Sequence, residues 1–473
     1  MGYSDELPPV PRPAPEALAA ALAALAGRFG NRCAASQAMR DQHAQSTSWL
    51  PRQPPDAVVF PENAADVQDI VRICAERRVP VIAYGTGTSL EGQVNAPAGG
   101  VCIDMRDMNR ILAVHAEDLD CVIEPGVTRK TLNETLRDQG LFFPIDPGAD
   151  ASIGGMAATR ASGTNAVRYG TMRDNVLALK VVRADGEMVT TSTRAKKSAA
   201  GYDLTRLFIG SEGTLGIITE LTMRLHGIPE SIAAASCSFP SVKDACNAVI
   251  LTIQAGIPVA RIELLDDVMV KAINAYSRQD LPEMPLLLLE FHGSAPEVEQ
   301  QSRRFGELAH ECGGGAFSWT TRPEDRTRLW QARHDAYWAA RALRPGTEQV
   351  TTDVCVPISR LADCVEETQR DLRENNLVSP IVGHVGDGNF HTVLLCDMND
   401  ADEIARAEGY VHRMVERALA MGGTCTGEHG IGQGKQKYLR RELGESAIDT
   451  MRMVKRALDP HNILNPGKLF AFH

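Results

Sequence analysis

Two kinds of apolar spacing organise the first half of the chain. Residues 64–77 carry apolar side chains at helical spacing after Asn63, which predicts an amphipathic helix with Asn63 as its N-cap. An Ala/Leu-rich run at 16–29 predicts an earlier helix. Short apolar runs predict strands at 79–84, 101–105, 121–125, 177–183 and 216–225. Glycine-dense segments at 147–170 and 210–216 separate the later strands.

The pattern changes near Pro229, after which strands and helices alternate. Strands are predicted at 232–239, 259–265, 286–292, 315–320 and 350–356. Helices are predicted at 241–255, 296–312, 323–343, 358–375, 402–421 and 445–458. A β-hairpin is predicted at 381–395. This order indicates an antiparallel sheet covered by helices, in a separate cap domain.

Length and composition predict several domains. The chain has 473 residues and is 44% apolar, enough to bury a substantial core in two to three domains. A Pro-rich joint at 51–55 opens the first of them. We expect an N-terminal helical segment at 1–50, a first domain at 51–228, a cap at 229–425 and a C-terminal segment at 426–473 that returns to the first domain.

Charge and hydropathy disfavour several classes of function. The net charge is −11, from 49 Lys and Arg against 60 Asp and Glu, which is a poor match to nucleic acid or an anionic membrane. No apolar run of about eighteen residues is present, so we expect no transmembrane segment. The 16–29 run follows acidic residues and prolines, which favours a helix packed on the domain over a signal peptide.

The 11 cysteines are scattered and contain no Cys-x-x-Cys pair. This distribution argues against an iron–sulfur or structural zinc motif and for a reducing compartment. We therefore expect a cytoplasmic protein, with peripheral docking at a membrane left open.

The predicted hairpin contains a candidate metal site. With a four-residue loop at 386–389, His384 would face His391, with Cβ atoms roughly 5 Å apart. Two such imidazoles can share a divalent metal, and a third ligand would leave a coordination position open for a substrate. Glu428, in the glycine-rich segment 424–432, is the candidate third ligand, and His429 competes with it. The alternative is a pair of surface histidines flanking a turn.

A glycine loop follows the strand at 79–84. Gly85-Thr86-Gly87-Thr88-Ser89 offers backbone N–H groups and hydroxyls that suit a pyrophosphate. The third glycine of a dinucleotide-binding fingerprint would fall at position 90, which is Leu, so a Rossmann fold is disfavoured. Gly434-Lys435 also lacks the remainder of a P-loop.

Three further segments extend this loop into an ordered set: 147–155, 162–170 and 210–217. Together the four resemble the flavin domain of the vanillyl-alcohol-oxidase superfamily, the PCMH-type FAD domain, over about 55–228. The resemblance implies FAD contacts at Gly85, Thr86, Gly87, Thr88, Ser89, Pro147, Gly148, Ser152, Gly154, Gly155, Ser162, Gly163, Tyr169, Gly170, Glu212, Gly213, Ile218 and Asn465. The first loop has no histidine, where related proteins with tethered flavin carry one, so we expect non-covalent FAD.

From 229 onward the chain resembles the C-terminal FAD-oxidase domain of the D-2-hydroxyacid dehydrogenases. Segments 329–334, 352–357, 383–391 and 424–432 are most similar to the FAD-dependent D-lactate dehydrogenases of the mitochondrial type. The implied fold class is α+β: a two-lobed PCMH-type FAD domain plus an α/β cap with an antiparallel sheet. The implied reaction is oxidation of a small D-2-hydroxy acid, with D-lactate to pyruvate favoured, and hydride transfer to flavin N5.

The chemistry of such a reaction suits the candidate residues. A metal on His384, His391 and Glu428, zinc or manganese, would chelate the substrate and lower the pKa of its hydroxyl. His429 is the candidate general base, since its ordinary pKa of about 6.5 suits that role. Arg333 offers a two-donor fork to the substrate carboxylate, although a solvated or ion-paired arginine is the alternative. Asn389 would orient the hydroxyl or the flavin edge.

Other members of this family, and other classes, compete with the D-lactate interpretation. A 2-hydroxyglutarate enzyme would carry a lysine where this chain has Thr351, which favours a small monocarboxylic acid. A glycolate-oxidising subunit, a non-redox FAD lyase or synthase, and a silent flavin-binding scaffold are the further alternatives. The electron acceptor is left open among a cytochrome, a quinone and an electron-transfer flavoprotein. The oligomeric state is open as well, a homodimer included.

Overall fold

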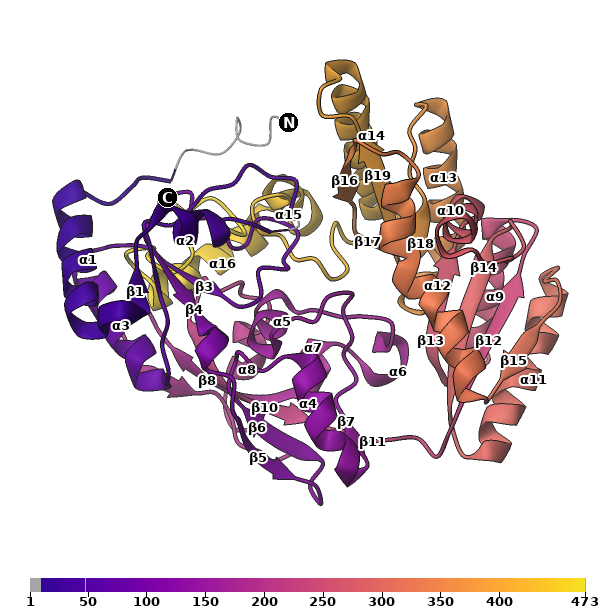
Figure 1. The fold of residues 1–473 in the computed structure, drawn as a ribbon, viewed down its shortest axis with the longest axis horizontal. Coiled ribbons are helices and arrows are strands. Elements are labelled where there is room, and N and C mark those ends of the chain that lie inside the picture. Colours follow the sequence, from indigo (N-terminus) through magenta and orange to yellow (C-terminus); the bar gives the residue numbers. More distant parts are fainter. Residues whose placement is uncertain (1–9, 47, 473) are drawn as a thin grey trace. The chain divides into compact units, whose positions relative to one another are not determined.

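The structure is a computed structural model that describes residues 10–46 and 48–472 (Figure 1). Part of the predicted N-terminal segment 1–50, namely 1–9 and 47, lies outside the described residues. Two compact units are present. The split unit contains residues 10–162, 171–228 and 428–472. The sheet unit contains residues 163–170 and 229–427.

The first lobe of the split unit is a four-stranded sheet in the order β1-β2-β4-β3. Its strands are β1 (Cys33–Ala34), β2 (Ala57–Val59), β3 (Val81–Tyr84) and β4 (Val101–Asp104), and β2, β4 and β3 run parallel. Helices α1 (Pro15–Phe29) and α3 (Ala64–Glu76) share its apolar core. The amide of Asp66 donates to Asn63 Oδ1, so the predicted N-cap is confirmed.

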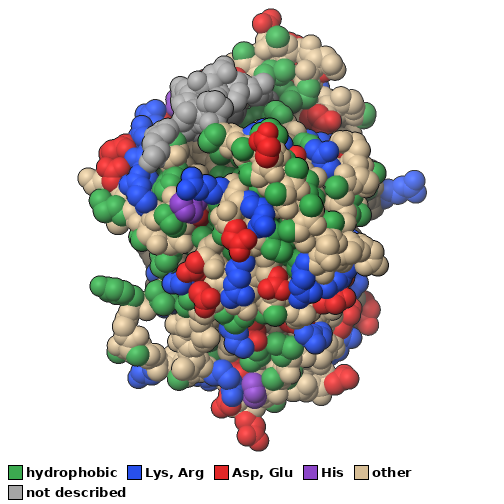
Figure 2. Space-filling view, turned by 90° about the vertical axis from the view of Figure 1, so that its left-hand side faces the viewer, with side chains coloured by type: hydrophobic (Ala, Val, Ile, Leu, Met, Phe, Trp, Pro, Cys, Tyr) green, Lys and Arg blue, Asp and Glu red, His purple; other side chains and the backbone are tan. Residues whose placement is uncertain are grey.

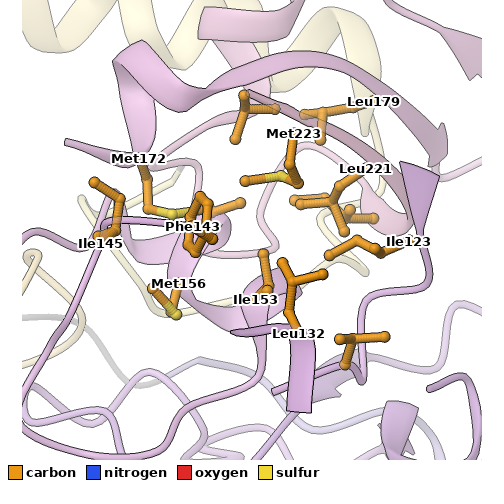
Figure 3. Packing of buried hydrophobic residues seen from close by; sticks show 14 of the residues in the cluster. Ile123, Leu132, Phe143, Ile145, Ile153, Met156, Met172, Leu179, Leu221 and Met223 are labelled. Atoms are coloured by element: carbon orange, nitrogen blue, oxygen red, sulfur yellow. The ribbon is translucent and has the colours of Figure 1, made fainter. Parts of the chain in front are cut away.

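The second lobe is a five-stranded antiparallel sheet in the order β5-β6-β10-β8-β9. Its strands are β5 (Ile111–His115), β6 (Asp120–Ile123), β8 (Val176–Val182), β9 (Met188–Thr190) and β10 (Ile217–Arg224). Figure 3 shows its core, where Phe143, Ile153 and Met156 pack beside Leu221 and Met223. A two-stranded ribbon joins β7 (Leu141–Phe142) to β11 (His226–Gly227).

Short helices and the C-terminal segment complete the split unit. They are α2 (Gln37–Gln42), α4 (Arg129–Leu136), α5 (Ile153–Thr159), α7 (Met172–Asn175), α8 (Leu204–Phe208), α15 (Gln436–Leu443), α16 (Glu445–Leu458) and the 3-10 turns η1 (Gly30–Arg32), η2 (Met105–Asp107) and η3 (Arg137–Gln139). The segment after α16 runs along β3, since Asn465 N donates to Val81 O and Val81 N donates to Ile463 O. The end of the chain therefore lies beside the strand that leads into the Gly85 loop.

One antiparallel sheet forms the sheet unit, in the order β15-β12-β14-β13-β18-β19-β16, with β17 pairing β19. The strands are β12 (Ser231–Ser238), β13 (Val259–Leu265), β14 (Leu286–Gly293), β15 (Ser318–Thr320), β16 (Glu348–Thr351), β17 (Val354–Cys355), β18 (Ile381–Gly383) and β19 (Asn389–Cys396). The helices are α6 (Ala166–Tyr169), α9 (Val242–Gln254), α10 (Asp267–Ser277), α11 (Ala295–Glu311), α12 (Pro323–Ala342), α13 (Leu361–Glu374) and α14 (Ala401–Ala420), with 3-10 turns η4 (Ile358–Arg360) and η5 (Val385–Asp387).

Helices cover this sheet through a continuous apolar core. Residues of α10 and α12 pack against Ala234, Leu288 and Val393 of the sheet. Helix α9 contacts both α11 and α13. The α+β fold class predicted from the sequence is confirmed. The strand predicted at 350–356 is wrong in its middle, because Thr352 and Asp353 interrupt it and separate β16 from β17.

The surface carries charges of both signs. On the face shown in Figure 2, basic and acidic side chains are interspersed among apolar ones rather than gathered by sign. Such mixing is typical of a solvated surface.

Helix α16 is anchored by a buried lysine, which generates a stability prediction. Lys455 Nζ donates to Thr214 O at 2.8 Å and Leu464 O at 2.9 Å and is ion-paired with buried Asp459. Lys455→Met removes one partner of this pair, so the free energy of unfolding should fall by about 3–5 kcal/mol in urea titrations. Exposed Lys130→Met on α4 is the control, with an expected change within about 0.5 kcal/mol. Equal losses in both variants would contradict the anchoring role.

Candidate functional site

His384 and His391 lie close together, although not in the predicted register. The strands pair Val382 with His391 and Ile381 with Thr392, so the expected pairing of His384 with His391 is wrong. The turn spans Val385–Gly388 because Val385 is buried and Gly388, at φ +80°, closes it. His384 is therefore a diagonal neighbour of His391. The ring centroids are 5.3 Å apart at an interplanar angle of 78°, and a ring nitrogen of each lies within 4.8 Å of the other.

Hydrogen bonds fix the tautomer of both histidines. His384 Nδ1 donates to Glu263 Oε1 at 2.7 Å, and His391 Nδ1 donates to the carbonyl of Thr352 at 3.0 Å. Carboxylate and carbonyl oxygens only accept, so each neutral ring carries its proton on Nδ1 and its lone pair on Nε2. Metal-binding histidines usually have such a partner on the second nitrogen. The interpretation as two surface histidines does not apply, because both side chains are buried.

Sequence reasoning missed Glu263, which is fully buried in β13. Its Oε2 accepts from Arg333 Nε at 2.7 Å on α12 while Oε1 accepts from His384. Burial raises the pKa of Glu263, but the electrostatic attraction and hydrogen bonds of His384 and Arg333 outweigh burial and hold that pKa below its usual range. The available signal was a charged residue inside the apolar strand at 259–265. Arg333 is therefore ion-paired, which was the alternative to a role in binding the substrate carboxylate. Only its Nε contacts Glu263.

Asn389 is held rigidly at the start of β19. Its Nδ2 donates to Asp353 Oδ1 and to Val354 O, both at 2.8 Å. Asp353 Oδ2 accepts from Thr426 Oγ1 at 2.8 Å, so this buried carboxylate ties the hairpin to the segment that precedes Glu428. Both amide hydrogens of Asn389 are used, and Oδ1 is the atom left to accept from a ligand. Sequence reasoning missed the role of Asp353.

The segment 424–432 crosses from one unit to the other. Gly427 belongs to the sheet unit, and a Cβ there would lie 2.2 Å from Asn389 Nδ2, so only glycine fits. Glu428 is the next residue along the chain and is half-buried. One peptide bond therefore separates it from a residue packed on the Asn389 side chain.

His429 belongs to the split unit, where Gln93 and Glu91 surround it. Gln93 Nε2 donates to His429 O at 2.8 Å, and Glu91 Oε1 lies 4.0 Å from His429 Nδ1. The buried Glu91 carboxylate is also 3.3 Å from Lys435 Nζ. Glu91 was missed by sequence reasoning, although it directly follows the first glycine loop. A carboxylate beside an imidazole can orient it and stabilise its protonated form.

Glu212 uses its side chain to hold the loop after His429. Its carboxylate accepts from Ile431 N at 2.7 Å and from Gly432 N at 2.8 Å, with the backbone at φ +52°. Burial raises the pKa of Glu212 to about 7, opposed by the two amide hydrogen bonds and the charge of Lys468. Burial also lowers the pKa of Lys468 to about 7. The Glu212 carboxylate, predicted to lie near FAD, is thus directed at the chain's own backbone.

The first glycine loop has the features of a cofactor cradle. A Cβ at Gly85 would lie 2.1 Å from Ser152 Oγ, and one at Gly87 would lie 2.2 Å from the Tyr84 hydroxyl. Gly154 is equally close to Pro125. Within the described residues, the buried Ser89 Oγ has no hydrogen-bond partner. A buried hydroxyl of this kind requires a partner, so the loop fits an added polar group such as a pyrophosphate.

The remaining predicted cofactor residues are distributed over both units. Gly163, Tyr169 and Gly170 belong to the sheet unit, where the Tyr169 hydroxyl lies 2.7 Å from His292 Nδ1. Asn465 belongs to the split unit and donates to Glu212 O at 2.7 Å and Gln93 O at 3.1 Å. The side chain of Ile218 is part of the apolar core. The others in the split unit are Thr86, Thr88, Pro147, Gly148, Gly155, Ser162 and Gly213.

Comparison with known proteins gives two family matches and many relatives. A family described as FAD linked oxidases, C-terminal domain, matches residues 228–469, and one described as FAD binding domain matches residues 55–192. A protein of Danio rerio named probable D-lactate dehydrogenase, mitochondrial, is 54% identical, covering 91% of this chain and 88% of the relative. D-lactate dehydrogenase (cytochrome), mitochondrial, of Arabidopsis thaliana is 50% identical, covering 89% and 74%. A glycolate oxidase subunit of Bacillus subtilis is 36% identical, covering 88% and 89%.

Solved structures show the same fold at low identity. Alkyldihydroxyacetonephosphate synthase matches with a TM-score of 0.75 and 20% identity, covering 98% of this chain and 88% of that chain. The 4-ethylphenol oxidase of Gulosibacter chungangensis matches with a TM-score of 0.78 and 19% identity, covering 98% and 99%. At this low identity, the two likenesses support the fold alone and do not indicate the reaction.

The expected cytoplasmic location is contradicted by these relatives. Four D-lactate dehydrogenases among them are named mitochondrial, which points to the mitochondrion. The prediction failed because free cysteines indicate a reducing compartment without identifying which one. Within residues 10–46 and 48–472, no helix is both long and apolar enough to cross a membrane.

The buried Glu212 generates a pH prediction. A carboxyl group whose pKa rises from 4.5 to about 7 on folding stabilises the fold while protonated. That contribution is complete below pH 4.5 and is lost as the pH rises through 7. The difference in unfolding free energy between the native protein and Glu212→Gln should therefore fall by up to about 3 kcal/mol between pH 4.5 and 7. Urea titrations measure it, and exposed Glu117→Gln should show a constant difference. A constant difference for Glu212→Gln would contradict the prediction.

Proposed function

Because the chain belongs to the family of FAD-linked oxidases, we propose that it oxidises a small D-2-hydroxy acid, with D-lactate to pyruvate as the favoured reaction. The observation that carries the proposal is the pair of buried histidines, His384 and His391, each anchored through Nδ1. A scaffold that only binds flavin has no need of two buried imidazoles in this arrangement, which cost free energy to desolvate. Identity of 54% to a D-lactate dehydrogenase over 91% of the chain supports the substrate class.

His384, His391 and Glu428 are the residues we propose for a divalent metal. Two Nε2 atoms within reach of one ion, with Glu428 one residue beyond Gly427, make a donor set that suits zinc or manganese. A bound metal of this kind supplies a Lewis acid for the oxygens of the substrate. The carboxylate and carbonyl partners of the two Nδ1 atoms would hold the rings in place during binding.

Three further residues would handle the substrate itself. The terminal nitrogens of Arg333 have no hydrogen-bond partner within the described residues, so the guanidinium retains a fork for the substrate carboxylate. Asn389 Oδ1 would accept from the substrate hydroxyl and orient it. His429 would take the hydroxyl proton, and the nearby Glu91 carboxylate would stabilise the resulting imidazolium. His429 therefore acts as base and Glu428 as ligand in this proposal.

FAD when bound would accept the hydride from C2 of the substrate. We propose that Gly85–Ser89 and the glycines at 154, 155 and 213 approach the cofactor through their backbones, with the Ser89 hydroxyl as one partner. No histidine occurs at 85–89, which supports non-covalent binding. The words "(cytochrome)" in the names of several relatives favour a cytochrome as the electron acceptor.

A second candidate is oxidation of glycolate, supported by the 36% identity to a glycolate oxidase subunit. Glycolate and D-lactate differ by one methyl group on C2, and a single methyl group in an apolar pocket is worth only about 1–3 kcal/mol. Thr351 at the end of β16 in place of a lysine argues against a second carboxylate on the substrate.

Flavin bleaching tests the reaction. The purified protein, supplemented with zinc or manganese, is mixed anaerobically with D-lactate, L-lactate, glycolate or D-2-hydroxyglutarate, and absorbance near the flavin maximum of about 450 nm is followed. D-lactate should bleach the flavin fastest, because the relative with 54% identity is named a D-lactate dehydrogenase and Thr351 argues against a second carboxylate. Faster bleaching by glycolate would favour the second candidate. A yellow protein that none of the four acids reduces would refute oxidation of small 2-hydroxy acids.

Replacing one histidine tests the metal. His391→Ala should abolish flavin reduction and remove the bound metal, while the FAD content stays that of the native protein, since FAD is proposed to lie mainly on the split unit. His429→Ala is the matched comparison: it should slow flavin reduction by about 100- to 10,000-fold and retain the metal. Metal analysis and absorbance spectra provide both readouts. Loss of FAD from His391→Ala would mean that His391 has a structural role. Loss of metal from His429→Ala would mean that His429 is a metal ligand and not the general base.

A further inference from the structure

A single buried carboxylate joins the proposed metal ligand to the proposed substrate-binding arginine. Glu263 lies at 0% exposure in β13, with one oxygen bonded to His384 Nδ1 and the other to Arg333 Nε, each at 2.7 Å. We propose that Glu263 is a positioning residue that sets the tautomer of His384 and the direction of the Arg333 fork together. The inference rests on the proposed function and adds to it a residue that touches neither substrate nor cofactor.

The sheet register explains why Glu263 reaches His384. Strand β13 pairs with β18 through Leu264↔Gly383 and Leu265↔Val382, and the next step of that register places Glu263 opposite His384. On its other side β13 is paired with β14 along most of its length. A residue on a strand hydrogen-bonded on both sides has little freedom to move, so the carboxylate is a fixed point for the less regular backbone at His384.

The contact with His384 determines which nitrogen can bind a metal. A carboxylate accepts only, so the proton of the imidazole stays on Nδ1 and the lone pair stays on Nε2. Without this acceptor, the neutral ring would also populate the tautomer with its proton on Nε2, which cannot bind a metal through that nitrogen. The negative charge in addition raises the basicity of the ligand.

The contact with Arg333 uses the guanidinium in a particular way. Nε alone is engaged, so the carboxylate neutralises the buried side of the group and leaves the outer edge, with Nη1 and Nη2, for a ligand. The Arg333 side chain is 20% exposed, whereas the Glu263 side chain is fully buried. Since His384 and Arg333 share one carboxylate, a single side chain sets the distance between the proposed metal ligand and the guanidinium fork of Arg333.

Glutamine cannot replace this carboxylate. Its side chain has one accepting oxygen and one donating NH2, so one of the two partners would face a donor with its own N–H. Glu263→Gln therefore leaves one of the two partners without an acceptor and removes the negative charge that raises the basicity of His384 and directs Arg333, while changing side-chain volume very little. A matched control exists in the neighbouring strand: Glu290 in β14 is also buried, accepts from His292 Nε2 at 2.7 Å and lies 3.8 Å from Arg261 Nε.

The experiment measures the dissociation constant of zinc for the FAD-loaded protein, by competition with a chromogenic chelator, together with KM and kcat for D-lactate at saturating zinc. Glu263→Gln should weaken zinc binding by about 10- to 100-fold, the range typical of lost second contacts to metal-bound histidines. Excess zinc should restore part of kcat while KM stays raised, because the Arg333 fork remains misdirected. Glu290→Gln should leave the zinc dissociation constant within about threefold of the native value.

Three outcomes would overturn the inference. They are an unchanged zinc affinity in Glu263→Gln, an equal loss in Glu290→Gln, and a full return of KM with zinc. If Glu263→Gln does not retain FAD, Glu263→Asp is measured instead; it keeps the charge with a shorter reach, and native zinc affinity in it also overturns the inference. A native protein that binds neither zinc nor manganese would instead refute the proposed metal, so the two failures are distinguishable.

Discussion

Charge that is removed from water must be compensated within the protein, and this constraint shapes both units. An isolated buried carboxylate or ammonium is costly, and the buried charges of Glu263 and Lys455 occur with partners that compensate them. Glu263 accepts hydrogen bonds from Arg333 and His384 in the sheet unit. In the split unit Lys455 is surrounded by Asp459 and two carbonyl groups. These contacts also join segments that are distant in sequence: Glu263 joins β13 to His384, and Lys455 joins α16 to Thr214.

The candidate site in the sheet unit follows from this requirement. The strands bring His384, His391 and Asn389 near one another, but their hydrogen bonds to the acceptors Glu263, Thr352 O and Asp353 determine how these side chains are oriented. The interruption between β16 and β17 serves the same arrangement, because Thr352 and Asp353 leave the strand pattern and supply the acceptors. These acceptors are the backbone carbonyl of Thr352 and the side chain of Asp353.

In the split unit a buried carboxylate, that of Glu212, finds its partners in the loop after His429 and not in a sheet. Glu212 accepts from two consecutive backbone amides and so defines the path of the chain just after His429. Gln93 Nε2 donates to His429 O, and Asn465 Nδ2 donates to the backbone carbonyl groups of Glu212 and Gln93. The glycine at 430 is needed because a Cβ there would lie 2.5 Å from Glu212 Oε1. Polar side chains and glycines thus act together to position one imidazole.

The sequence by itself determined the α+β class, the N-cap at Asn63, the length of helix 445–458 and the FAD-binding family. These are local properties, since apolar periodicity, capping and glycine motifs are set by neighbours within a few residues. The tertiary structure decided the register of the 381–395 hairpin, the break near Asp353, and the roles of Glu263, Glu91 and Glu212. Those features depend on contacts between residues far apart in the chain, such as Glu263 with His384, and on which charges are buried together. No local pattern of residues encodes a partner more than a hundred positions away, so only folding could reveal them.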